Sequence, residues 1–279
     1  MTNYLPITDQ VCLLLVFLVG LPHGAIDGPL ISNIVKSKIS TSYWLSSYLL
    51  IAIIFYFLWS NSPTFCLSFF LVISVIHFGL GDIRNSPNFK KIVENKIISS
   101  VVFIAHGCII PIVIPILHQE QTSSFFNLLG VEDVFFLYTL IRFLFVFWLF
   151  SFCIYLLYSI KNRELLPGMI ELILLVIIIY FTTPLFSFTV YFCMIHTPRH
   201  IRDIYNSFQN KNVYKEVMIK ALPFVIITWT LLGALFLYST RVLNLTYDES
   251  LLQTIFISLA SLTIPHMIFI DGFFERHTN

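Results

Sequence analysis

Two histidines in the segment YFCMIHTPRH, His196 and His200, lie four residues apart at the end of a long apolar run. On a helix this spacing puts both imidazoles on the same face, one turn apart. Ionisable side chains are costly in a membrane helix and usually face the interior of a helix bundle. Neutral imidazole is a good ligand for iron, copper, nickel and zinc. The pair therefore indicates either a buried metal site or hydrogen bonds between helices.

Three further motifs resemble one another, because each places an aspartate four or five residues after a histidine. They are LPHGAID with His23 and Asp27, IHFGLGD with His77 and Asp82, and IPHMIFID with His266 and Asp271. Such a carboxylate can orient an imidazole or neutralise positive charge. It can equally cap a helix end or reach water. Pro22, Pro198 and Pro265 are expected to bend the helices here, which leaves room for a site.

The composition identifies the elements that must position these residues. Hydrophobic residues make up 57% of the 279 positions and charged residues 11%, with a mean hydropathy of +0.86. This predicts a multi-span membrane protein. The net charge of +1 gives no sign of nucleic-acid binding. The five cysteines lie in apolar runs without a CxxC pair, which indicates neither a disulfide framework nor a metal cluster.

Apolar runs long enough to cross a bilayer predict an all-α, polytopic transmembrane helix bundle. We expect about nine spans, with eight to ten possible, in one integral membrane catalytic domain over residues 1–279. The first run has no Lys or Arg before it and is interpreted as a span, not a cleaved signal peptide. The runs lie near residues 8–28, 43–60, 63–83, 97–117, 133–159, 166–182, 184–203, 217–239 and 250–270.

Basic residues predict the orientation, because Lys and Arg accumulate in cytoplasmic loops. Fourteen of the sixteen fall on one side of the predicted spans, and only Arg142 and Arg241 do not. We therefore expect the N-terminus outside and the C-terminus in the cytoplasm, in a multi-pass protein of the inner (plasma) membrane. On this orientation five histidines lie near the cytoplasmic ends of their spans, within a layer about 10 Å deep. They are His23, His77, His196, His200 and His266.

We interpret four of these residues, His23, His77, His196 and His200, as metal ligands. Hydrogen bonding between helices is the favoured interpretation for His106, near mid-membrane, and for His266. His118 is expected to be solvated.

The number of ligands bears on the metal. Four imidazoles on tetrahedral zinc would form a closed, structural site. Four ligands on octahedral iron leave two positions for dioxygen and a reactant. Glu171, in the apolar run PGMIELILLV, is expected at a similar depth. We interpret it as a hydrogen-bond partner of a ligand histidine or as a counter-charge to the cation, with direct ligation less favoured.

These motifs together resemble the Brp/Blh family of membrane β-carotene 15,15′-dioxygenases. The matching residues span nearly the whole chain in order. They are Pro22 to Asp27, His77 to Gly79 with Asp82, His106 and Gly107 with Pro111, Glu171, Pro184 and Leu185, Tyr191 and Phe192, His196, His200, and Pro265 and His266 with Asp271. The Gly28-Pro29 pair departs from the polar or His residue expected in many relatives, which bears on substrate fit.

The resemblance implies cleavage of the central double bond of β-carotene by dioxygen, which gives two molecules of retinal. It also implies Fe²⁺ held by His23, His77, His196 and His200. Asp27, Asp82, Glu171, His266 and Asp271 would then support the ligands. The hydrocarbon substrate would enter from membrane lipid, and retinal would be available to a rhodopsin. Phe78, His106, Tyr191 and Phe192 are the predicted substrate-lining residues.

Two other classes of protein fit part of the pattern. Membrane di-iron hydroxylases and desaturases carry several HxxxH and HxxHH boxes, whereas this chain has one such box. Two irons per chain would favour that class. A haem-binding or metal-carrying membrane protein without oxygenase activity also fits buried His and Glu on apolar helices. A Soret band would identify the haem protein.

Overall fold

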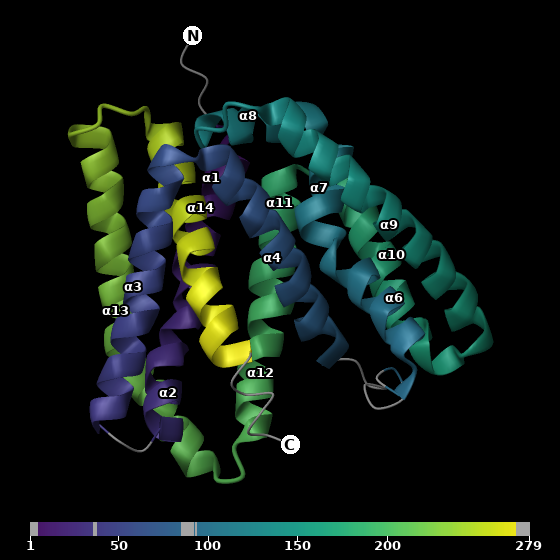
Figure 1. Ribbon diagram of the computed structural model, residues 1–279, viewed down its shortest axis with the longest axis horizontal. Coiled ribbons are helices and arrows are strands. Elements are labelled where there is room, and N and C mark those ends of the chain that lie inside the picture. The colour runs from purple at the N-terminus through teal and green to yellow at the C-terminus, as the bar shows by residue number, and fades with distance from the viewer. Residues whose placement is uncertain (1–4, 36–37, 85–91, 93, 272–279) are drawn as a thin grey trace. The chain divides into compact units, whose positions relative to one another are not determined.

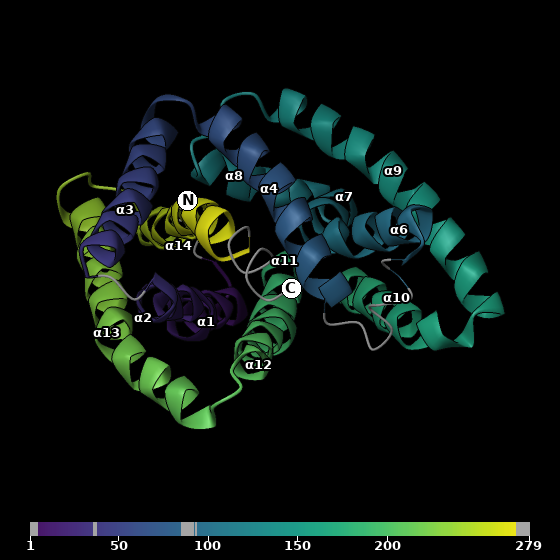
Figure 2. The same ribbon diagram turned by 60° about the horizontal axis from the view of Figure 1, so that its bottom comes forward.

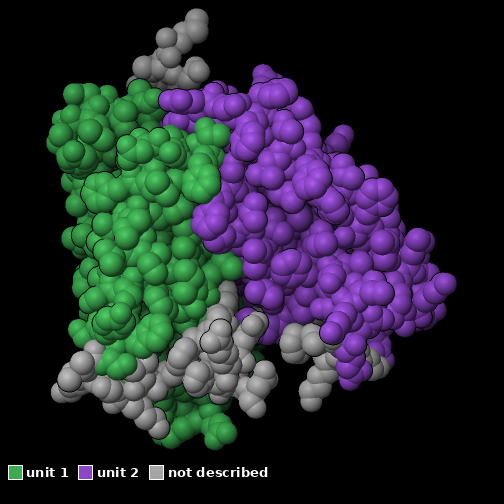
Figure 3. Space-filling view, in the orientation of Figure 1, with its two compact units in different colours: residues 1–66, 200–279 green, residues 67–199 purple. Residues whose placement is uncertain are grey.

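The computed structural model describes all residues except 1–4, 36–37, 85–91, 93 and 272–279. Within the described residues the regular structure is helical, as the composition predicts (Figure 1). The chain forms two compact units, which Figure 3 colours separately. Unit 1 comprises residues 1–66 and 200–279, and unit 2 comprises residues 67–199. The single catalytic domain expected from the sequence stays a prediction, and each unit is described by itself.

Unit 1 contains the helices of both ends of the chain. They are α1 (Ile7–Leu15), η1 (Val16–Gly20), η2 (Leu21–Ile26), α2 (Asp27–Val35), α3 (Lys38–Asn61), α13 (Lys211–Arg241), α14 (Tyr247–His266) and η6 (Met267–Asp271). Pro22 lies in η2, a 3-10 segment, and Pro265 is the second-last residue of α14, just before η6, a π-helix. Both bends predicted in this unit therefore lie at changes of helix type.

Helix α14 lies beside α3 and α13, as Figures 1 and 2 show. Its start is fixed by a capping box, in which the side chains of Thr246 and Glu249 satisfy backbone N–H groups reciprocally. Helix α13 in turn contacts η2 and α2. Buried side chains of these helices, including Leu30, Tyr48 and Val217, form one hydrophobic core. This core holds the ends of η2 and α14 together.

Unit 2 contains the middle of the chain. Its helices are α4 (Pro63–Arg84, which begins in unit 1), α6 (Lys96–Gly107), η3 (Ile109–Val113), α7 (Ile114–Leu117), α8 (Gln119–Leu128), α9 (Val134–Lys161), η4 (Arg163–Leu165), α10 (Leu166–Phe181), α11 (Pro184–Thr189) and η5 (Val190–His196). Helix α12 (Thr197–Ser207) continues directly from η5, and the boundary between the units falls inside it. Within unit 2, α9 packs against α6 and α10.

Two glycines allow α4 and α6 to approach closely. A Cβ on Gly107 would lie 2.3 Å from the carbonyl oxygen of Val75, and a Cβ on Gly79 would lie 2.7 Å from the Phe103 ring. Small residues at such crossings let backbones of membrane helices come together. The approach brings the C-terminal half of α4, which carries His77 and Asp82, against the end of α6.

The described residues contain seven helices long and apolar enough to cross a membrane. An eighth is added if Lys96–Gly107 and Ile109–Leu117, bent by 47° at a short break, form one span. The prediction of about nine spans is therefore higher than the number found in the described residues, although eight lies within the expected range. The predicted span that is not among these helices is the run 184–203. This run is helical, but His196, Arg199 and His200 interrupt its apolar residues, and it is not apolar enough to qualify as a membrane span.

Candidate metal site

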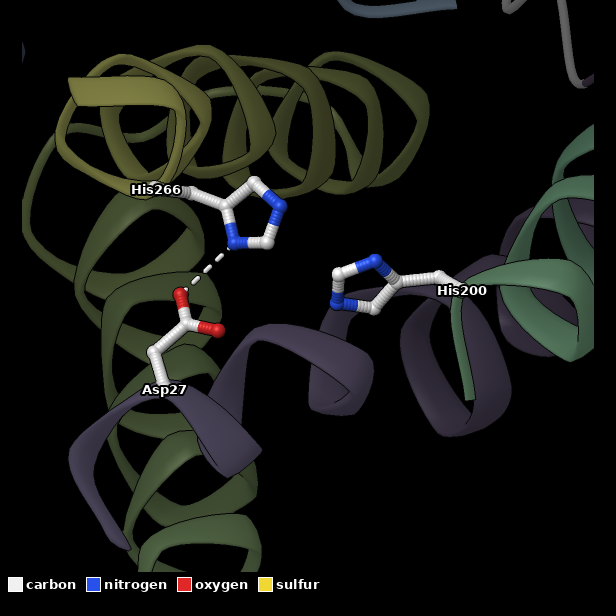
Figure 4. A group of neighbouring side chains, drawn as sticks. All are labelled: Asp27, His200 and His266. Atoms are coloured by element: carbon white, nitrogen blue, oxygen red, sulfur yellow. Dashed lines mark hydrogen bonds and ion pairs between the residues drawn. The ribbon is translucent and has the colours of Figure 1, made fainter. Parts of the chain in front are cut away.

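Asp27, His200 and His266 form a buried group of potential metal ligands in unit 1 (Figure 4). One ligand atom from each side chain lies within 4.8 Å of the others. The imidazole of His200 points toward Asp27 and His266 in Figure 4, and its ring centroid lies 5.1 Å from that of His266. Carboxylate and imidazole ligands suit several transition metals. The group can therefore hold or support a cation.

A hydrogen bond between Asp27 and His266 fixes the orientation of that imidazole. His266 Nδ1 lies 2.7 Å from Asp27 Oδ2, and both side chains are almost completely buried. An ionised carboxylate can only accept, so it holds the imidazole proton on Nδ1 and leaves the lone pair on Nε2. Carboxylates orient metal-binding histidines in the same way. His266 is thus prepared to act as a ligand through Nε2.

Asp27 is itself held by α3. The hydroxyl of Tyr48 donates to Asp27 Oδ2 over 2.9 Å, and the Tyr48 ring packs on Phe269 of η6. Asp27 begins α2, directly after the 3-10 segment η2. The change of helix type around Pro22 therefore sets the direction of the carboxylate, while Tyr48 locks it in place.

His77 and His196 form a second histidine pair, in unit 2. Their Nε2 atoms lie 3.0 Å apart, and both residues are buried. Aromatic rings surround His196. The ring of Phe78 lies edge-on at 5.0 Å, and those of Tyr191 and Phe192 are stacked on it at 6.2 Å and 5.7 Å between centroids. The π-helix η5 places these two rings against the imidazole, and π-helical turns occur frequently at functional sites.

A buried ionic network adjoins this pair. Asp82 accepts hydrogen bonds from the Tyr191 hydroxyl over 2.8 Å and from Arg199 Nη1 over 2.8 Å. Arg199 Nη2 donates to Glu171, and His106 Nδ1 lies 3.6 Å from Asp82 Oδ2. Asp82 therefore neutralises positive charge, one of the roles expected for these aspartates. Asp27 takes another of these roles and orients an imidazole.

The structure places the remaining predicted residues as follows. Glu171 pairs with Arg199, which is not one of the four histidines predicted as ligands. His118 lies partly buried with its Nε2 2.6 Å from the carbonyl oxygen of Ile179, so the expectation of a solvated side chain is wrong. The contact with Ile179 of α10 takes the place of a hydrogen bond to water. The side chains of His23 and Asp271 lie outside the described part of the structure.

Arg199 is the functional candidate that the sequence analysis missed. The positive-inside pattern assigned it to a cytoplasmic loop, yet its side chain is only 22% exposed and bridges two carboxylates. Its position three residues after His196 was a usable signal. An arginine one helical turn from a predicted ligand shares a helix face with it. The sequence could not indicate which carboxylates it would meet.

The fold and these residues define a class of protein: a multi-span helical membrane protein with buried histidines and carboxylates that can bind a metal. The profile of the beta-carotene 15,15'-dioxygenase family matches residues 14–274, and the chain belongs to this family. A beta-carotene 15,15'-dioxygenase from an uncultured marine bacterium, 66A03, is 30% identical over 278 residues. That alignment covers 99% of this chain and 97% of the relative. No solved structure matches the chain. The family resemblance predicted from the motifs is thereby confirmed.

Proposed function

We propose that this protein cleaves the central 15,15′ double bond of β-carotene with dioxygen and releases two molecules of retinal. The observation that carries the proposal is family membership over nearly the whole chain. The reaction balances without another reactant, because each half of the broken double bond takes one oxygen atom as an aldehyde. Several long apolar helices also suit a substrate that is dissolved in lipid.

We propose further that the cofactor is Fe²⁺ and that its ligands are His23, His77, His196 and His200. The His77–His196 pair supports this assignment, since their Nε2 atoms lie 3.0 Å apart. Two buried imidazole nitrogens that face each other this closely could both ligate one ion. A direct hydrogen bond between the two rings is the alternative, and metal analysis distinguishes them. When bound, the ion would supply the binding and activation of dioxygen.

The protein's own residues would then orient the ligands and exclude water. Asp27 holds His266, which makes His266 a candidate additional ligand beside His200. Phe78 and Phe192 pack on His196 and bury it among apolar rings. A dry, aromatic surrounding suits a polyene and limits side reactions with water. The predicted substrate-lining role of Phe78, His106, Tyr191 and Phe192 stays a prediction.

The proposed setting is the inner (plasma) membrane, with the N-terminus outside and the C-terminus in the cytoplasm. The distribution of Lys and Arg in the sequence supports this orientation. The long apolar helices support a multi-pass protein. Delivery of retinal to a rhodopsin stays a prediction from the family resemblance.

The experiment is expression in cells that make β-carotene. We expect the cells to lose orange colour and to accumulate retinal, measured by chromatography, whereas cells expressing His196→Ala stay orange. Persistence of β-carotene with folded protein in the membrane would overturn the proposal. Metal analysis of the purified protein tests the cofactor, because two irons per chain or a Soret band would point to the other classes.

A further inference from the structure

Asp82 contacts residues on both sides of His196, and this arrangement has a consequence for the histidine pair. Its Oδ2 accepts from Tyr191, five residues before His196, and its Oδ1 accepts from Arg199, three residues after it. All of these residues belong to unit 2. Both oxygens of the Asp82 carboxylate thus accept hydrogen bonds from the segment that carries His196.

Asp82 also shares helix α4 with His77. The same two segments therefore meet at two places, through the His77–His196 pair and through the bonds of Asp82. A slip of one residue between α4 and η5 would move His77 about 1.5 Å along its helix and rotate it by about 100°. Such a slip would also break both bonds to the buried carboxylate, whose side chain is only 2% exposed.

We propose that Asp82, Tyr191 and Arg199 form a clamp that fixes the register of α4 against η5, and with it the separation of His77 and His196. The three are positioning residues, since they act through the two imidazoles. Buried hydrogen bonds to a charged group are among the stronger ones, and leaving such a group unsatisfied is costly. The clamp therefore strongly favours one register.

The charge of the clamp also suits a nearby cation. The carboxylates of Asp82 and Glu171 outnumber the guanidinium of Arg199, so the formal charges of these three side chains sum to −1. In a low-dielectric interior this charge would lower the free energy of a cation held by neutral imidazoles. This part of the inference rests on the proposed metal-binding function, whereas the register does not.

Tyr191→Phe tests the clamp because it removes one oxygen and keeps the ring that stacks on His196. The matched control is Tyr138→Phe. Tyr138 is equally buried in unit 2, and its hydroxyl bonds to Thr122 and the Gln119 carbonyl, away from the clamp. Both variants lose the same atom from a buried hydrogen bond, so a general loss of stability would affect both.

The first measurement reports the register without a metal. The full-length protein carrying His77→Cys and His196→Cys, with its five native cysteines replaced, is treated with dibromobimane, which fluoresces after bridging two close thiols. We expect Tyr191→Phe to lower the bridging yield and Tyr138→Phe to leave it unchanged. Equal yields in the two backgrounds would overturn the clamp.

The second measurement titrates the metal-free protein, with its native histidines, with Co²⁺ alone and follows visible absorbance. We expect Tyr191→Phe to weaken Co²⁺ binding by about 10- to 100-fold, a loss as large as that caused by removing a residue that orients a metal ligand. Tyr138→Phe should bind like the wild type. If wild type and His196→Ala bind Co²⁺ equally while the bridging yields still differ, the clamp stands and the proposed ligand set falls. If Tyr191→Phe binds as tightly as Tyr138→Phe while His196→Ala has lost binding, the clamp does not control the metal, and the part of the inference that concerns the cation is overturned.

Discussion

Asp27 Oδ2 and His266 Nδ1 lie 2.7 Å apart, although 239 positions separate the two residues in the chain. The contact joins the first histidine motif to the last. Within the first motif, Asp27 follows His23 by four residues, and the spacing alone suggested a partner in the same motif. The packing of α14 against η2 supplies His266 as a partner, and Tyr48 holds the carboxylate from α3.

Asp27→Asn should weaken metal binding by about 10-fold or more, because the amide no longer holds the His266 proton on Nδ1 by its charge. Metal content per chain, measured by mass spectrometry after dialysis, checks this. Asp248→Asn is the matched control, since Asp248 is also buried in unit 1 but accepts from the backbone N–H of Leu5. Similar metal content in the two variants would argue against an orienting role for Asp27.

His196→Ala should abolish both bound iron and retinal formation, because it removes one of the two facing imidazoles in unit 2. His118→Ala should keep both. His118 contacts the carbonyl oxygen of Ile179 and lies outside both candidate histidine groups. Iron content and retinal yield are measured on the same preparations. Equal iron in the two variants would remove His196 from the ligand set.

Arg199→Met should destabilise the protein by about 3 kcal/mol, because it leaves the buried Asp82 without its counter-charge. This value lies at the lower end of the range for breaking a buried ion pair. The reason is that Glu171, the second carboxylate bound by Arg199, is 29% exposed and stays partly hydrated. Adding Asp82→Asn should recover part of the loss. Lys220→Met, which removes an exposed pair with Glu216, should have no measurable effect. The free energy of unfolding of each variant is measured in detergent micelles. Equal stability of Arg199→Met and Lys220→Met would contradict this account.

Gly107→Ala should destabilise the protein by about 1–3 kcal/mol, because its Cβ would lie 2.3 Å from the Val75 carbonyl oxygen and force α4 and α6 apart. Retinal formation should fall with it, since α4 carries His77. Gly233→Ala, where a Cβ meets no atom within 4 Å, should be neutral or stabilising by up to about 1 kcal/mol. Thermal unfolding of both variants is the measurement, and a stable Gly107→Ala would show that the helices can separate.

Much of the helix pattern could be predicted from the sequence, because apolar runs of bilayer length report directly on membrane helices. The run 184–203 is the exception. Its helical character was predicted correctly, but its polar residues belong to a buried network and not to an ordinary span. Hydropathy averages over a window cannot separate a polar residue in a loop from one that is paired inside the protein. For this reason the sequence did not reveal that Arg199 is paired with two carboxylates.

The sequence by itself determined the class of protein, the family and the candidate histidines, since residue types, their local spacing and their order along the chain are sequence properties. Only the tertiary structure decided the partners. It joined Asp27 to His266, and Asp82 to Tyr191 and Arg199. Hydrogen bonds between distant segments depend on the direction in which each helix turns its side chains. Changes of helix type at η2 and η5 alter that direction, so spacing in an ideal helix did not reveal these partners.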